Sequence, residues 1–312
     1  MENLIYSLNA TVPVFLVILA GFVLKRVGWI NDEFIRVANK LNFRITLPCL
    51  LVQDLMARDI REEFDLKYIL FCAVVTTVCF FSIWGGAKLF IKDKSITGAF
   101  VQASFRGSAA VLGTAFVINI YGDSGSVPLM IVGAVPLYNI FSVVVLEAES
   151  NGDGGRKLKK TIKGVFTNPI LIAIVLGIIL SFFRVEFPAM VDNTITNFSK
   201  LATPLALLAI GGTFDGTEAI KKLKPTIAGS LIKLVVQPAI FLPVAVMMGF
   251  RGAKLMALVI MLGSPTTPSC YIMTKNMNND GTITTSMVVV TTLFSAFTIT
   301  GIIFILRSLG YL

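Results

Sequence analysis

Long apolar stretches constrain this chain more than any other feature, because about 20 consecutive apolar residues can cross a bilayer as a helix. Ten such stretches alternate with short polar connections along the 312 residues. They lie near 4–24, 38–56, 67–91, 97–120, 126–148, 162–183, 197–214, 225–249, 253–275 and 283–306. Only 14% of the residues are charged, against roughly a quarter in soluble domains. The sequence therefore predicts an all-α membrane protein with ten transmembrane helices and no separate soluble domain.

The chain also repeats itself at half its length. When residues 157–312 are laid over 1–156 without a gap, helix breakers and turn residues fall in register. The paired positions are Pro13 with Pro169, Gly21 with Gly177, Pro48 with Pro204, Asp59 with Asp215, and Gly107–Ser108 with Gly263–Ser264. Each half holds five spans, an odd number, so the second half must enter the membrane from the opposite side. We predict two inverted five-helix repeats, 1–149 and 162–312, joined by a linker at 150–161. Internal duplication in a membrane protein is typical of transporters.

Positively charged residues gather in alternate connections, which sets the expected orientation, because cytoplasmic loops carry the excess of lysine and arginine. The basic-rich connections follow the first, third, fifth and seventh spans, and the linker is one of them. We therefore expect a multi-pass protein of the cell membrane with both termini outside and the central linker in the cytoplasm. The net charge of +9 is explained by these loops, so the bilayer rather than a nucleic acid is the expected partner.

Metal and disulfide chemistry have little support in the sequence. The four cysteines all lie inside predicted spans, and the chain has no histidine. Without a cluster of Cys or acidic residues at ligand spacing, we expect no metal site, no disulfide framework and no cofactor. No nucleophile lies beside a base in a recognisable pattern, so an enzyme is not expected either.

Polar and helix-breaking residues interrupt the fourth and ninth spans at equivalent repeat positions. In the ninth span, Pro265 and Pro268 each remove a backbone donor; in the fourth, the break depends on glycine. Lipid cannot satisfy exposed backbone groups, so such breaks persist only against protein or a water-filled cavity. Two broken helices that cross near the bilayer midplane would direct half-helix N-termini at one point and form an anion site. The alternative is that small residues only allow close helix packing.

Three ionisable side chains inside the spans are candidates for function. Arg106 lies about ten residues into the fourth span, where a charge is costly, and its fork suits a carboxylate; a structural pair is the alternative. Lys233 either reaches the cytoplasmic surface along its stem or forms a charge pair. Asp54 is the one acid that can lie within a span rather than at its end, and it belongs either to coupling or to the interface. With so few embedded acids, proton or sodium coupling has little support. Sodium sites made only of oxygen atoms, from Ser, Thr, Asn and broken-helix carbonyls, remain an alternative.

Four segments resemble the auxin efflux carrier family, which includes plant auxin exporters and bacterial permeases associated with malate or malonate. They are LNFRITLPCLLV (41–52), SFRGSAAVLG (104–113), PLYNIF (136–141) and GSPTTPSCYIM (263–273). The resemblance covers the whole chain and implies the inverted-repeat fold of bile-acid and sodium/proton transporters. It also implies that spans four and nine are crossover helices, with elevator-like movement.

The first crossover departs from the family pattern Asn-x-Gly-x-x-Gly-x-Pro. Its four positions here are Ser108, Ala110, Gly113 and Ala115, so one glycine is kept. The missing proline weakens the prediction of a sharp break in span four. The second crossover retains Pro265.

We therefore expect a secondary transporter of small organic anions, most simply carboxylates, with an open question whether it forms a homodimer. The candidate substrate-binding residues are Arg106, Ser108, Gly113, Tyr138, Asn139, Ser264, Pro265, Thr266 and Thr267; Asp54 and Lys233 are candidates for coupling or a charge pair. Two alternatives remain at this point. One is a sodium- or proton-coupled carrier of the bile-acid-transporter type, and the other is a transport-inactive sensor or partner-binding membrane protein.

Overall fold

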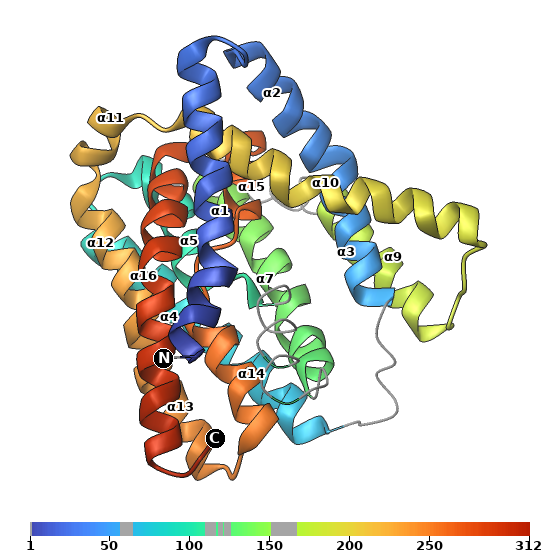
Figure 1. Cartoon of the computed structure of the whole chain (residues 1–312), viewed down its shortest axis with the longest axis vertical. Helices are drawn as coiled ribbons and strands as arrows, with labels where there is room; N and C mark the ends of the chain where they lie inside the picture. The colour runs from blue at the N-terminus through green and yellow to red at the C-terminus, as the bar shows by residue number, and fades with distance from the viewer. Residues whose placement is uncertain (1, 57–64, 110–116, 118–120, 122–125, 151–166) are drawn as a thin grey trace.

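Helices are the regular secondary structure of every part of the chain that the computed structural model describes, namely residues 2–56, 65–109, 117, 121, 126–150 and 167–312. The all-α prediction is therefore confirmed for these ranges (Figure 1). The helices of the first half are α1 (Glu2–Val27), α2 (Asp32–Leu41), η1 (Asn42–Thr46), α3 (Leu47–Met56), α4 (Leu66–Phe90), η2 (Lys94–Ile96), α5 (Thr97–Phe105) and α7 (Val127–Glu149). Those of the second half are α9 (Pro169–Phe182), α10 (Ala189–Thr213), α11 (Gly216–Lys221), α12 (Leu223–Leu231), η3 (Ile232–Val236), α13 (Gln237–Met247), α14 (Gly252–Gly263), α15 (Ser269–Asn276) and α16 (Gly281–Ser308).

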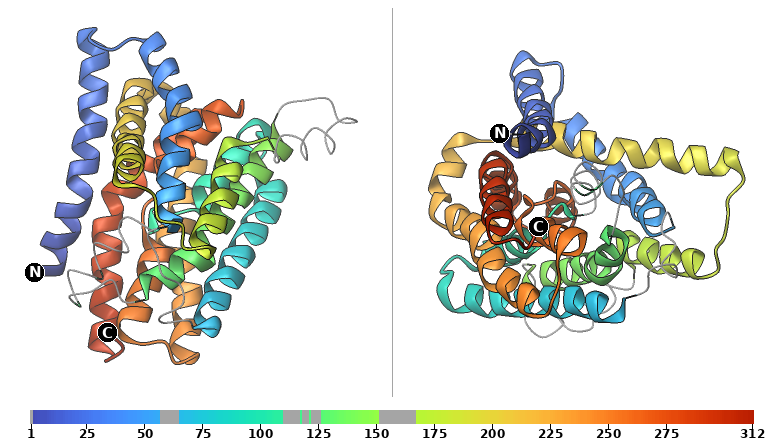
Figure 2. Two further views of the ribbon diagram at one scale, coloured as in Figure 1. Left: turned by 90° about the vertical axis from the view of Figure 1, so that its right-hand side faces the viewer. Right: turned by 60° about the horizontal axis from the view of Figure 1, so that its bottom comes forward.

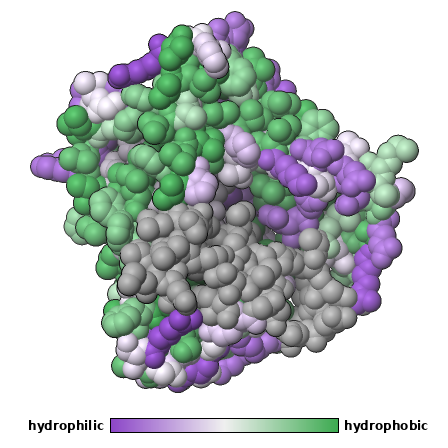
Figure 3. Space-filling model, viewed as in Figure 1, coloured by the Kyte–Doolittle hydropathy of each residue, from purple (hydrophilic) through white to green (hydrophobic). Residues whose placement is uncertain are grey.

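Several helices have the length and hydropathy of membrane spans. Among the described residues, four pass both criteria, α4, α7, the continuous run Leu223–Met247 and α16, while α9 and α14 are shorter apolar helices. Large apolar side chains also face outward, among them Leu16 on α1 and Phe294, Phe297 and Phe304 on α16. Much of the upper half of the face in Figure 3 is apolar. An apolar exterior is what lipid requires, so the chain is a multi-pass membrane protein.

The helices pack in two groups. In one group α10 lies against α1, α2 and α3, and α9 lies against α3. In the other, α4, α5 and α7 pack together, and α16 contacts α5, α12 and α14. The groups meet where α1 runs along α16 and where α15 touches α2, η1 and α10 (Figures 1 and 2).

Two helices contain a widened turn just before a proline. The π-helical segments η1 and η3 end two residues before Pro48 and Pro238. In each, the helix continues through an i→i−5 bond, Leu47 N to Asn42 O and Gln237 N to Ile232 O. A proline ring collides with the carbonyl four residues earlier, and the wider turn makes room for it. These turns carry Asn42 and Lys233, two of the buried polar residues of the molecule.

The segments predicted as the fourth and ninth spans are both interrupted within their described residues. Helix α5 ends at Phe105, and α14 ends at Gly263 before α15 begins at Ser269. The extended residues 106–108 follow α5, and residues 264–267 lie between α14 and α15. We refer to these two stretches as the crossing segments. They pair with each other through a single antiparallel bridge between Gly107 and Thr266 and a hydrogen bond from Ser108 N to Pro265 O of 2.9 Å.

Candidate functional site

The break after α5 needs no proline because other elements satisfy the carbonyl groups that it exposes. Thr266 Oγ1 donates to Ala103 O at 2.8 Å, and Gln237 Nε2 donates to Ser104 O at 2.6 Å. A buried carbonyl without a donor costs free energy comparable to a lost hydrogen bond. The two side chains therefore stabilise the end of α5, and they come from the other half of the sequence.

The end of α14 is satisfied in the same way. Lys233 Nζ donates to Met261 O at 3.2 Å and to Leu262 O at 2.8 Å. Tyr138 of α7 also donates its hydroxyl to Met261 O, at 3.2 Å. The C-terminal end of a helix carries partial negative charge, so an ammonium group is well placed there.

Gly107 allows the two crossing segments to approach. A Cβ atom at this position would lie 2.9 Å from Lys233 Nζ and closer still to Ser264 Oγ. Both neighbours are fully buried, so they have little room to move away. The glycine is thus required by the close approach of the segments rather than by its backbone angles.

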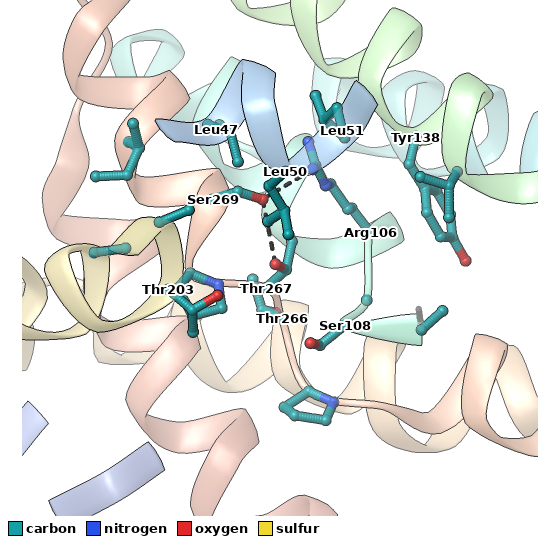
Figure 4. A pocket seen from close by; sticks show the side chains of 18 of the residues that line it. Leu47, Leu50, Leu51, Arg106, Ser108, Tyr138, Thr203, Thr266, Thr267 and Ser269 are labelled. Carbon is teal, nitrogen blue, oxygen red and sulfur yellow. Dashed lines mark hydrogen bonds between the residues drawn. The ribbon is translucent and has the colours of Figure 1, made fainter. Parts of the chain in front are cut away.

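A cavity of about 160 Å³ lies beside the crossing segments. Its walls come from α1, η1, α3, α7, α10 and α16 as well as from the crossing segments and the start of α15 (Figure 4). The polar lining residues are Asn42, Asp54, Arg106, Ser108, Tyr138, Thr203, Thr266, Thr267, Ser269 and Thr292. Leucine, valine, alanine and isoleucine side chains make up most of the remainder. A concave, largely apolar pocket with a few convergent polar groups is the usual form of a small-molecule site.

Arg106 contributes a full positive charge to the cavity wall. It is 5% exposed, and its guanidinium group donates to Ser269 Oγ at 2.8 Å, Met273 Sδ at 3.0 Å and Ser142 Oγ at 3.4 Å. Figure 4 shows the guanidinium group directed toward Ser269. Arginine has five N–H donors, and residues in the described part of the chain accept three of them, which leaves two for a ligand within that part. No ion pair joins Arg106 to a carboxylate within the described ranges.

The structure brings most of the predicted site residues together. Those that line the cavity are Arg106, Ser108, Tyr138, Pro265, Thr266, Thr267 and Asp54. Tyr138 does so with its hydroxyl already bonded to Met261 O. Asp54 lies on the same cavity as Arg106, which the sequence did not indicate.

Three predicted residues lie elsewhere, and one lies outside the described residues. Asn139 is buried in α7 and donates to Val135 O of its own helix at 2.9 Å. Ser264 is buried behind Gly107, and Lys233 caps α14 rather than reaching the membrane surface. Gly113 falls in the part of the chain for which no structure is described.

Sequence reasoning missed several cavity residues. Ser269 follows Pro268 directly and belongs to a segment that was already singled out, so it could have been included. Thr203 precedes Pro204, a repeat marker, and Asn42 opens the widened turn before Pro48. Thr292 had no local signal, because it is one of many hydroxyl residues on α16. Within the described ranges, no group of three His, Cys, Asp or Glu residues could hold a metal ion.

The fold and the cavity define a multi-pass helical membrane protein with a small cavity, lined by both Arg106 and Asp54, where two interrupted helices cross. Residues 6–303 match the family described as "Membrane transport protein". The chain therefore belongs to this family, the auxin efflux carrier-like transporters that its sequence segments resemble.

Curated relatives span nearly the whole chain. A protein of Rhizobium meliloti named "Putative malonate transporter" is 23% identical over 317 residues, which cover 95% of this chain and 94% of the relative. The "Uncharacterized transporter YfdV" of Escherichia coli is 26% identical over 284 residues, covering 88% and 90%. An "Uncharacterized transporter" of Methanothermobacter thermautotrophicus is 22% identical over 293 residues, covering 93% and 95%.

Proposed function

We propose that this protein is a secondary transporter that moves small carboxylates across the cell membrane and binds them at Arg106. The observation that carries the proposal is the geometry of Arg106. It is a buried guanidinium group on the wall of a cavity between interrupted helices, with two N–H donors left and no ion-paired carboxylate among the described residues. A buried charge at membrane depth is expensive and is a functional candidate for that reason. A bound carboxylate would offset part of that cost.

The size of the cavity favours a short ligand. A protein cavity of about 150 Å³ holds benzene, so about 160 Å³ suits a molecule of about six or seven non-hydrogen atoms. Malonate, the substrate in the name of the Rhizobium meliloti relative, falls in this range. The chemistry of the site thus supports carboxylates of two to four carbons as the substrate class.

The proposed architecture is ten spans in two inverted repeats, 1–149 and 162–312, with the linker 150–161 in the cytoplasm and both termini outside. The two packing groups support an elevator-like movement. The group that contains α5, α14 and α16 would carry the substrate past the group formed by α1, α3, α9 and α10. Most of the cavity lining comes from the boundary between the two groups, where relative movement would change its access.

Ligand binding and transport of defined variants test the proposal. We expect malonate to raise the melting temperature of the purified protein, because a ligand that binds only the folded state stabilises it by mass action. Arg106→Gln removes a charged hydrogen-bond donor and should raise the Kd for malonate by roughly 10–100-fold. Arg106→Lys keeps the charge but loses the forked pair of N–H donors, so its Kd for malonate should lie between those of the wild-type protein and Arg106→Gln.

The matched control is Arg307→Gln, which changes an exposed arginine near the end of α16 and should leave the Kd unchanged. Uptake of labelled malonate into liposomes should follow the same order. An unchanged Kd in folded Arg106→Gln protein would exclude the substrate role. A protein that responds to no small carboxylate would instead fit the alternative of a transport-inactive sensor.

A further inference from the structure

Lys233 is a buried cation whose partners are backbone carbonyls. Its side chain is fully buried, and its Nζ atom donates to Met261 O and Leu262 O at the end of α14. None of the ion pairs within the described residues includes it. The side chain therefore points into the protein and does not extend to the membrane surface.

The carbonyl groups at a helix break are also the groups that hold a coupling ion in many carriers. In discontinuous transmembrane helices, unwound carbonyls and half-helix C-terminal ends coordinate Na⁺. The end of α14 offers such a set of oxygen atoms. Ser264 Oγ lies next to it, is completely buried and has no hydrogen-bond partner within the described structure. A Cβ atom on Gly107 would contact both Ser264 Oγ and Lys233 Nζ, which places the two groups on the same side of the crossing.

The other broken end is closed by a neutral side chain from the same helical run. Gln237 lies four residues after Lys233 and donates to Ser104 O at the end of α5. The run from 223 to 247 thus donates to exposed carbonyls at the ends of both interrupted helices, alongside the bonds from Thr266 and Tyr138. A mobile cation is not needed to neutralise either end.

We propose that the Lys233 ammonium group occupies the position that a coupling Na⁺ would hold at the end of α14, so that this protein binds its anion without sodium. The position assigned to the Lys233 ammonium group rests on the geometry of the crossing. The statement that the anion binds without sodium also rests on the proposed carrier function. Lys233 also distinguishes this chain from a sodium-coupled carrier. A bound sodium ion can leave for the solvent, whereas the ammonium group is covalently attached to the protein.

The position of the cation is tested on the purified protein without substrate. We expect the melting temperature of the wild-type protein to be the same in sodium chloride and in choline chloride of equal ionic strength. Lys233→Ser removes the ammonium group and leaves an oxygen-lined space at Met261 O, Leu262 O and Ser264 Oγ. It should melt roughly 3–10 °C lower, and sodium but not choline should restore part of this loss.

Two further variants control this experiment. Lys233→Met fills most of the space with an apolar chain, so it should lose stability and show no response to sodium. Lys224→Ser changes an exposed lysine in the same helical run and should behave as the wild-type protein. Stabilisation of the wild-type protein by sodium would overturn the inference. So would a Lys233→Ser protein that melts at the wild-type temperature or fails to respond to sodium.

The second arm measures malonate affinity of the wild-type protein in the two salts. We expect the same Kd in both, and a Kd that falls several-fold when sodium replaces choline would overturn the inference. This arm remains decisive even if Lys233→Ser does not fold. If malonate and other small carboxylates fail to bind at all, the proposed function is wrong. The melting temperatures of the substrate-free proteins still test whether Lys233 occupies the position of a sodium ion.

Discussion

At the scale of single residues, the crossing depends on a glycine and two cations with different partners. Arg106 faces the cavity and is bonded to neutral side chains, which leaves its charge available to a ligand. Lys233 lies next to Gly107 but is not among the residues that line the cavity. It is bonded to carbonyl oxygens at a helix end, whose partial negative charge offsets its own. Sequence alone presents both as basic residues inside apolar spans.

Gly107→Ala tests how closely the crossing segments are packed. The added methyl group would overlap Ser264 Oγ and lie 2.9 Å from Lys233 Nζ, and overpacking of this kind costs about 1–3 kcal/mol. We expect a lower melting temperature and weaker malonate binding. Gly85→Ala is the matched control, because the space around Gly85 in α4 is open and alanine favours a helix. Equal stability of the Gly107 and Gly85 variants would show that the segments can move apart.

At the scale of elements, the interrupted helices are held by side chains from distant parts of the chain. Thr266 joins its segment to two helices, since its backbone N donates to Thr291 Oγ1 of α16 at 3.0 Å and its hydroxyl donates to Ala103 O of α5. The ninth span has prolines in its break, and the fourth has none. The fourth is interrupted nevertheless, because the bonds from Thr266 and Gln237 replace those that a continuous helix would make.

Thr266→Val should therefore weaken the end of α5. Valine has nearly the same shape as threonine but leaves Ala103 O without its donor, which costs about 1–3 kcal/mol for a buried acceptor. The measurement is thermal unfolding of the purified protein, together with malonate affinity. Thr194→Val removes the same kind of hydroxyl from an exposed site on α10 and should have little effect. If both variants unfold at the wild-type temperature, the capping argument is wrong.

At the scale of the whole molecule, the loops gather at two ends. At one end, Lys67 Nζ donates to Met248 O at 2.7 Å and Gly252 N donates to Tyr311 O at 3.1 Å. At the other, Trp84 Nε1 donates to Glu149 at 2.8 Å, and Asn279 Nδ2 donates to Leu146 O at 3.0 Å. The 25-residue helix α4 separates Lys67 from the end where Glu149 lies. The C-terminus and the start of the linker thus belong to opposite ends of the molecule.

Cysteine labelling tests which end faces the cytoplasm. In a background without the native cysteines, Ser308→Cys should react with a membrane-impermeant thiol reagent in intact cells, and Ser150→Cys should not. The reason is the excess of basic residues in the loops on the linker side. After permeabilisation both positions should react, which controls for accessibility. The reverse pattern in intact cells would invert the proposed orientation.

The sequence by itself determined the class of fold and the location of the break in the ninth span. A long apolar run can cross lipid as a helix because a helix satisfies its own backbone hydrogen bonds. Pro265 and Pro268 interrupt the ninth span because proline lacks a backbone donor. Local residue chemistry was sufficient for these features. It also placed Arg106, Ser108 and Thr266 near one another, because broken helices in equivalent repeat positions are expected to meet.

Only the tertiary structure decided which polar groups face the cavity. Lys233 and Asn139 were candidates by their chemistry, yet one caps a distant helix end and the other bonds within its own helix. Ser269 and Thr292 line the cavity because of how α15 and α16 pack. The physical reason is that a hydrogen bond across more than a hundred residues, such as that from Gln237 to Ser104, depends on where whole helices lie. The residues next to Gln237 or Ser104 in the sequence do not predict that placement.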